Sequence, residues 1–205
     1  MKSNQELVKY LKSTGVLKSP QIVRAFEKID RADFVREDFV DDTYGDYPLP
    51  IGLGQTISQP TTVAFMLELL EPKEGEKILD VGTGSGWTAA LLGVIVGRSG
   101  RVLGTELVPE LVEFGRANLL KCGIPNVRIL QAGKTLGLPG EELFDRILVS
   151  ASAEKPPREL INQLKIGGVM VVPILNSIWR ITKMSKEIKK EEFPGFVFVP
   201  LIQNK

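Results

Sequence analysis

The chain of 205 residues contains no histidine and only one cysteine, Cys122. The absence of histidine excludes histidine-based catalytic triads, histidine-ligated metals and the most common general base of enzymes. A single cysteine excludes an intramolecular disulfide and a thiolate metal cluster, so we expect no metal site. Any enzyme with this sequence must therefore run a reaction that needs no imidazole group.

The sequence also lacks an excess of one charge and any long apolar run. Its 26 basic and 25 acidic side chains give a formal net charge of +1, which provides no broad positive field for nucleic acid. The one basic cluster, residues 183–190, is interrupted by Glu187 and is interpreted as a solvated strand end and turn. No stretch has transmembrane length, and the first 15 residues lack the apolar core of a signal peptide. We therefore expect a cytoplasmic monomer that binds neither nucleic acid nor membrane.

The spacing of apolar residues predicts a helical start followed by an α/β arrangement. Two short amphipathic helices are expected within residues 1–30 and another after Pro60, whereas residues 31–60, rich in Asp, Pro and Gly, are expected to form a loop. In the tail, residues 177–184 and 196–202 alternate apolar side chains and are predicted to form an antiparallel pair. Between these ends the sequence predicts strands at 77–81, 101–106, 127–131, 144–150 and 167–175, with helices at 88–96, 109–123 and 156–165.

This alternation of strands and helices implies a parallel sheet with helices on both faces. Ligands of such sheets bind at the carboxyl ends of the strands, where the strand order reverses. The length of the chain favours one globular unit. Within it, residues 1–60 would supply the N-terminal helices and a substrate and cofactor loop, and residues 61–205 would form the α/β domain.

A glycine-rich turn, Asp80-Val-Gly82-Thr-Gly84-Ser-Gly86, follows the first expected strand. Glycines allow a ligand to approach the backbone, and the helix that follows presents free N–H groups. Glu106 ends the next strand 20 residues after Gly86, where an acidic side chain of a Rossmann-type unit binds the ribose hydroxyls. The sequence therefore predicts a site for a nucleotide or a nucleoside.

Two kinds of ligand fit this turn. The glycines and Ala89 match the G-x-G-x-x-A form of a dinucleotide site, which would bind NAD. Asp80 favours a ligand that has an ammonium group and no pyrophosphate, because a carboxylate repels a pyrophosphate but helps to hold an ammonium group. The arrangement resembles the first motif of the class I methyltransferases, whose ligand, S-adenosylmethionine, carries no phosphate.

A second stretch, Gly54-Gln-Thr-Ile-Ser-Gln-Pro60, narrows the resemblance. With the glycine turn, it makes the chain similar to the protein-L-isoaspartate O-methyltransferase family. This resemblance implies transfer of a methyl group from S-adenosylmethionine to the free carboxylate of L-isoaspartyl residues in damaged proteins. It also implies a Rossmann-like sheet of seven strands with the last one antiparallel, after a small helical N-terminal extension. The matching segments are residues 46–60, 78–91, 106–111, 143–152, 160–173 and 198–201.

Site residues follow from the same resemblance. Ser58 takes the place of the family's active-site serine, and Gln55 is a supporting position. The carboxylate to be methylated has a pKa near 4, so it is already an anionic nucleophile at neutral pH. The reaction therefore needs no general base and is compatible with the lack of histidine. The cofactor-binding residues implied are Thr56, Ile57, Ser58, Asp80, Gly82, Thr83, Gly84, Ser85, Glu106, Leu107, Ala132 and Gly133.

Three positions depart from the family pattern. Gly133 stands where the family has the aspartate of a Gly-Asp-Gly sequence that faces the adenine amino group. Thr61, expected next to the cofactor pocket, stands where many members have histidine, and Val197 where arginine is common. These departures leave two alternatives open: a diverged class I methyltransferase with another substrate, and a paralogue of low activity that binds S-adenosylmethionine.

Overall fold

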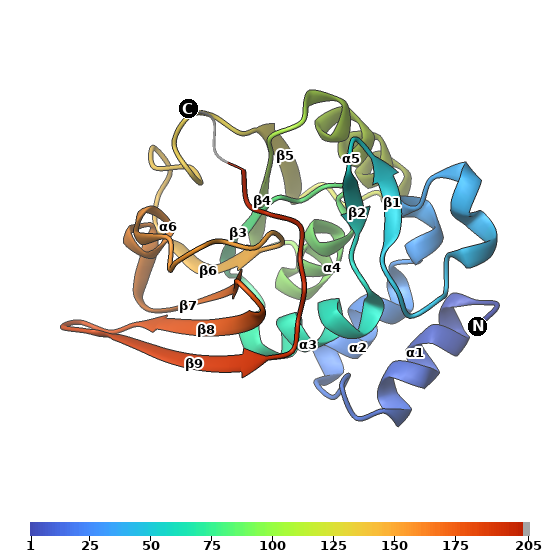
Figure 1. Cartoon of the computed structure of the whole chain (residues 1–205), viewed down its shortest axis with the longest axis horizontal. Coiled ribbons are helices and arrows are strands. Elements are labelled where there is room, and N and C mark those ends of the chain that lie inside the picture. Colours follow the sequence, from blue (N-terminus) through green and yellow to red (C-terminus); the bar gives the residue numbers. More distant parts are fainter. Residues whose placement is uncertain (203–205) are drawn as a thin grey trace.

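The computed structural model describes residues 1–202 and contains a seven-stranded sheet of strand order β5-β4-β3-β6-β7-β8-β9 (Figure 1). The five strands from β5 to β7 are parallel, and β8 and β9 each run antiparallel to the preceding strand. The predicted sheet of seven strands is confirmed, with one difference. The sheet ends in two antiparallel pairings, β7 with β8 and β8 with β9, where the prediction had one antiparallel strand. The strands are β3 (Lys77–Val81), β4 (Arg101–Glu106), β5 (Val127–Gln131), β6 (Phe144–Val149), β7 (Leu164–Ile174), β8 (Ser177–Lys183) and β9 (Ile188–Pro194).

The order of the parallel strands reverses at β3, which is flanked by β4 on one side and β6 on the other. At such a reversal the connections leave in opposite directions and open a crevice beyond the carboxyl ends of the strands. The glycine turn follows β3 directly, so the topology places it at this crevice.

Helices cover both faces of the sheet, as predicted. Alternate strand residues face opposite ways, so Ile78 belongs to one apolar core and its neighbour Leu79 to the other. The first core extends through α3 (Pro60–Leu70), α4 (Trp87–Val96) and α5 (Pro109–Cys122) to an outer layer of α1 (Asn4–Ser13) and α2 (Pro20–Lys28). The second core lies under α6 (Arg158–Asn162), which is shorter than the helix expected at 156–165 because β7 already begins at Leu164. Within residues 1–202, no helix has both the length and the apolar character of a membrane span.

The prediction of a loop at residues 31–60 is wrong in part. This segment contains the 3₁₀ helices η1 (Arg31–Phe34) and η2 (Glu37–Asp42), and a hairpin of β1 (Leu49–Gly52) and β2 (Gln55–Ile57). Gly52 and Gly54 adopt φ angles of 97° and 74° at the hairpin turn, in the left-handed region that favours glycine. The buried side chains of Ile51 and Ile57 hold the hairpin against the body of the protein.

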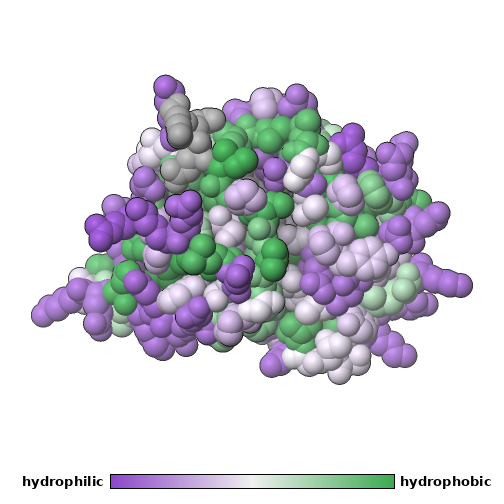
Figure 2. Space-filling model, viewed as in Figure 1, coloured by the Kyte–Doolittle hydropathy of each residue, from purple (hydrophilic) through white to green (hydrophobic). Residues whose placement is uncertain are grey.

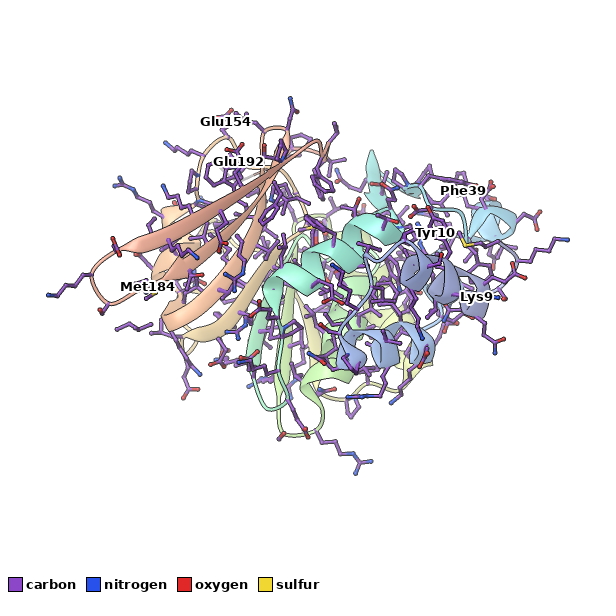
Figure 3. The ribbon with its side chains drawn as sticks, turned by 90° about the horizontal axis from the view of Figure 1, so that it is seen from below. Lys9, Tyr10, Phe39, Glu154, Met184 and Glu192 are labelled. Atoms are coloured by element: carbon purple, nitrogen blue, oxygen red, sulfur yellow. The ribbon has the colours of Figure 1, made fainter. Side chains whose placement is uncertain are left out.

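The tail corrects a second prediction. The partner of β8 is β9, whose exposed Lys-rich and Glu-rich sequence has no apolar alternation, and not residues 196–202. The basic cluster 183–190 spans the end of β8, the turn and the start of β9, and Met184 marks the projecting tip of this hairpin (Figure 3). Pro194 ends β9, and Gly195, with a φ of 98°, turns the chain away from the sheet edge.

Residues 196–202, here called the C-terminal strap, instead run over the carboxyl ends of the strands (Figure 1). The Ser152 N–H donates to the Val199 carbonyl at 2.8 Å, and the Leu201 N–H donates to the Ser152 carbonyl at 2.8 Å. Phe65 of α3 stacks on Phe196 with ring centres 5.2 Å apart. It also meets Phe193 edge-on at 5.6 Å. This aromatic cluster fixes the start of the strap to the helix that follows the Ser58 segment.

Phe65→Ala should therefore weaken both the fold and the attachment of the strap. Loss of two aromatic contacts and part of the buried ring is expected to lower the free energy of unfolding by about 2 kcal/mol. Urea unfolding measures this change. Leu120→Ala, which removes an apolar side chain that is 83% exposed, is the control and should stay within about 0.5 kcal/mol of the parent protein. Equal stability of the two variants would contradict the anchoring role of Phe65.

Candidate active site

A cleft at the carboxyl ends of the central strands encloses about 1030 Å³ of space, part of it open to solvent. On the face shown in Figure 2, hydrophobic residues gather toward the middle and hydrophilic ones along much of the outline. The cleft walls come from both ends of the chain and from the central strands. They are formed by Ile51 and residues 55–58 of the hairpin segment, 81–85 and 87–88 at the glycine turn, 105–108 after β4, 132–137, 150–151 and 199–202 of the strap.

The structure brings together nearly all the residues predicted for the cofactor. Gln55 and Ser58 also line the cleft, so the predicted serine faces the same space as the glycine turn. Asp80 is the exception, because it lies beneath the turn and does not line the cleft. The predicted residues that line it are Thr56, Ile57, Ser58, Gly82, Thr83, Gly84, Ser85, Glu106, Leu107, Ala132 and Gly133.

Glycine is required at the turn for two reasons. Gly82, Gly84 and Gly86 have φ angles of 74°, 52° and 87°, which side-chain-bearing residues rarely adopt. In addition, a Cβ atom on Gly84 would lie 3.1 Å from the Cδ1 atom of Ile51. The β1 strand therefore packs closely against the turn, and the backbone of the turn forms part of the cleft wall.

Glu106 is fixed in position by backbone groups. One carboxylate oxygen accepts the N–H of Gly84 at 2.9 Å, and the other accepts the N–H groups of Leu107 at 2.7 Å and Val108 at 3.0 Å. The side chain is buried but lines the cleft. Three donors hold the carboxylate before any ligand arrives, which suits it to accept hydrogen bonds from a pair of hydroxyl groups.

Asp80 is fully buried and only partly satisfied. Its Oδ2 accepts the hydroxyls of Thr83 at 2.8 Å and Thr88 at 2.7 Å, whereas its Oδ1 has no partner among the described residues. Burial raises the Asp80 pKa from 3.8 to about 6, against the effect of the two hydroxyls, and the charge of Glu106 adds to the rise. The unpaired oxygen leaves one acceptor beneath the turn for an ammonium group or a water that bridges to one.

Ser58 lies between the end of β2 and the start of α3, and its carbonyl accepts a hydrogen bond from Arg31 at 3.1 Å. Arg31 is fully buried and also donates to the carbonyls of Tyr47 at 3.1 Å, Gly45 at 3.3 Å and Thr43. Its guanidinium carbon lies 5.3 Å from the centre of the Trp87 ring. Burial lowers the Arg31 pKa to about 10, so the side chain keeps its charge at neutral pH.

The sequence did not reveal Arg31, because its partners are carbonyl groups that any residue supplies. It also missed Lys134, Leu136 and the strap residues of the cleft. Residues 198–201 match the family pattern, and this match is a signal that the strap belongs to the site. The apolar alternation of the same residues, however, predicts a strand. Trp87 is buried against Phe26, with ring centres 5.7 Å apart, and acts mainly in packing.

The three departures from the family pattern occupy different places. Gly133 lines the cleft, and a Cβ atom there would meet nothing within 4 Å. Thr61 does not line the cleft, contrary to the expected place beside the pocket, and instead donates two hydrogen bonds to Asp46. Val197 is 87% exposed and lies outside the cleft wall. Of the three, only Gly133 is placed to touch a bound ligand.

A parallel sheet that reverses at β3, a glycine turn after that strand and a buried acid after the next one form a Rossmann-type nucleoside site. Together with the family match and the solved structure described next, this arrangement is that of a class I methyltransferase dependent on S-adenosylmethionine. Residues 2–205 match the family model described as protein-L-isoaspartate(D-aspartate) O-methyltransferase. The chain belongs to this family.

Known relatives agree with this assignment. The protein-L-isoaspartate O-methyltransferase of Methanopyrus kandleri is 44% identical over 207 residues, which cover 98% of this chain and 92% of the relative. That of Pyrococcus horikoshii is 41% identical over 201 residues, which cover 95% and 90%. Among solved structures, one from Plasmodium falciparum described as such an enzyme, in complex with S-adenosyl-L-homocysteine, superposes with a TM-score of 0.90. It is 27% identical, and the match covers all of both chains.

The raised pKa of Asp80 predicts how the stability of the ligand-free protein depends on pH. The folded state keeps the Asp80 proton up to about pH 6, whereas the unfolded chain releases it near pH 4. The unfolded state therefore binds fewer protons in this window, and the free energy of unfolding falls as the pH rises through it. From this group alone the loss is about 2 kcal/mol between pH 4 and pH 7.

Urea unfolding of the protein and of Asp80→Asn at pH 4.5 and pH 7 measures this effect, since asparagine does not titrate. The variant should lose less stability between the two pH values than the parent does. Other carboxylates titrate in both proteins, including Glu76, whose pKa burial also raises, and their contribution cancels in the comparison. An identical pH dependence in both proteins would show that Asp80 does not carry the raised pKa.

Proposed function

We propose that this protein transfers the methyl group of S-adenosylmethionine to the free carboxylate of L-isoaspartyl residues in damaged proteins and peptides. The observation that carries the proposal is the single cleft that joins Ser58 to the glycine turn and Glu106. It is supported by the family membership and by the relatives about 40% identical over nearly the whole chain, which are named as protein-L-isoaspartate O-methyltransferases.

The residues of the cleft fit this cofactor. Glu106, held by three N–H groups, would accept hydrogen bonds from the ribose hydroxyls. The unpaired Oδ1 of Asp80 supplies negative charge beneath the turn for the amino-acid end, directly or through water. Ala132 and Gly133 would border the adenine. A carboxylate beneath the turn would repel a pyrophosphate, and the Asp80 Oδ1 has no partner among the described residues to neutralise it. This favours S-adenosylmethionine over NAD.

The protein needs to do little covalent chemistry. The bound cofactor would supply an electrophilic methyl carbon next to a positively charged sulfur. The isoaspartyl carboxylate is an anion at neutral pH, so no residue of this chain has to remove a proton. Ser58, half-buried in the cleft wall, would donate a hydrogen bond to one carboxylate oxygen and turn the other toward the methyl carbon.

Orientation is therefore the main contribution of the chain. Holding an attacking oxygen in line with its target lowers a barrier by roughly 7–11 kcal/mol in well-oriented systems. The Ser58 segment meets this requirement because Arg31 fixes its backbone from the buried side. The absence of histidine from the sequence costs nothing in such a mechanism.

We further propose that the protein acts as a monomer in the cytoplasm. Every wall of the cleft comes from residues 51–202 of one chain, so no second copy is needed to complete it. Cys122 is unpaired, which fits a reducing compartment. Burial, helped by the nearby Asp33 carboxylate, raises the Cys122 pKa to about 11, so the thiol is unreactive.

The direct test uses an isoaspartyl peptide and cofactor labelled on the methyl group. A base-labile methyl ester should form, and the same peptide with a normal aspartate should give none. Ser58→Ala should lower kcat/KM by about tenfold to a hundredfold, because a hydrogen bond to a charged group contributes roughly 1.5–3 kcal/mol. Ser99→Ala, an exposed serine outside the cleft, is the matched control and should leave the rate unchanged.

Three results would count against the proposal. A base-stable methylated product would indicate a methyltransferase with another nucleophile. Cofactor binding by calorimetry without turnover of any isoaspartyl peptide would indicate a binding protein of low activity. Equal transfer to the normal aspartyl peptide would remove the isoaspartyl specificity.

Gly133→Asp should strengthen cofactor binding. The site has room for the side chain, and a carboxylate there would restore the acceptor that the family resemblance places opposite the adenine amino group. One added hydrogen bond of roughly 0.5–1.5 kcal/mol should lower the Kd for S-adenosylmethionine by about twofold to tenfold in calorimetry. Gly140→Asp adds the same charge at another open glycine outside the cleft and should leave the Kd unchanged. Weaker binding in Gly133→Asp would contradict this placement of the adenine.

A further inference from the structure

The four residues from Ser58 to Thr61 are held by two charged side chains, Arg31 and Asp46, that lie outside the cleft wall. At the first end, the Ser58 carbonyl accepts the buried Arg31 guanidinium at 3.1 Å. At the second end, the Asp46 carboxylate accepts the Thr61 N–H at 2.9 Å and the Thr61 hydroxyl at 2.7 Å. The segment is thus fixed at both ends, at the residue that faces the substrate and again three residues after it.

Asp46 makes further bonds to the same region. Its backbone carbonyl accepts the Gln59 side-chain amide at 3.0 Å, and its Oδ2 also accepts the Tyr10 hydroxyl at 3.3 Å. Tyr10 belongs to α1, on the side of the molecule formed by the N-terminal helices (Figure 3). The neighbours of Asp46 in sequence, Gly45 and Tyr47, both give their carbonyls to Arg31. Arg31 and Asp46 therefore share one short backbone stretch and act on one target.

We propose that Asp46 and Thr61 are positioning residues for Ser58, an inference that rests on the proposed methyl transfer. Only Gln59 and Pro60 separate Thr61 from Ser58 along the chain. Proline fixes its own φ and restricts the residue before it to extended conformations. A shift of the first turn of α3 is therefore transmitted to Ser58 instead of being absorbed between them.

The threonine is suited to this task by its two donors. Its N–H and its hydroxyl bind the two oxygens of one carboxylate, so Asp46 fixes both the backbone and the side chain of the first helical turn. Hydrogen bonds to a carboxylate are stronger than those between neutral groups. The positive charge of Arg31 faces the same carboxylate, since Asp46 acts to raise the Arg31 pKa against the larger effect of burial.

The test compares Thr61→Val with Thr61→Ser. Valine keeps the shape and the N–H but removes the hydroxyl, whereas serine keeps both donors. Thr61→Val should lower kcat for an isoaspartyl peptide by about tenfold, since small misplacements remote from the reacting atoms can cost up to a hundredfold. The Kd for S-adenosylmethionine should stay unchanged, because Thr61 does not line the cleft. Thr61→Ser should keep the parent kcat, as should Thr14→Val, which removes a threonine hydroxyl directly after the end of α1.

A second measurement does not depend on activity. Hydrogen–deuterium exchange of the amides at residues 58–64 should be faster in Thr61→Val and in Asp46→Asn than in the parent protein and Thr61→Ser. If the parent does not methylate isoaspartyl peptides, the proposed function fails, while the exchange rates still test the positioning. Parent-like kcat and exchange in Thr61→Val would overturn the inference. An equal loss in Thr61→Ser, or a rise in cofactor Kd that matches the fall in kcat, would overturn it as well.

Discussion

A buried guanidinium that has no salt bridge among the described residues organises the substrate side of this protein. Arg31 donates hydrogen bonds to the backbone carbonyls of Thr43, Gly45, Tyr47 and Ser58. Its guanidinium carbon lies over the ring of Trp87, the first residue of the helix after the glycine turn. One side chain thus links a chain segment with little regular structure to the rigid α/β core. An unpaired buried charge is costly, and here the carbonyl groups that it gathers offset that cost.

The two sides of the cleft are built on different principles. On the cofactor side, the glycine turn and Glu106 lie at the ends of two neighbouring parallel strands, β3 and β4. The Gly84 N–H links them by donating a hydrogen bond to the Glu106 carboxylate. On the substrate side, Ser58 sits between a three-residue strand and a helix, and charged groups behind the wall hold it. A regular sheet supplies the precision in the first case and a polar network supplies it in the second.

Sequence reasoning identified the parts whose signals are local. The spacing from Gly86 to Glu106, the short apolar strands and the Ser58 stretch led to the sheet and to most of the cleft wall. It did not find features that depend on distant partners. The β9 strand has exposed, charged residues and is defined by its pairing with β8. The strap alternates apolar residues like a strand, yet Phe65 and Ser152 redirect it. The sequence predicts that Asp80 supports the ligand, directly or through water, but its depth below the turn follows from the tertiary structure.

The cleft is closed by the hairpin segment near the start of the chain and by the strap near its end. Contacts between residues so far apart in sequence form only after a large loss of chain entropy. The parallel strands and the glycine turn by themselves would lack two walls of the cleft. The capacity to transfer a methyl group is therefore a property of the whole folded chain.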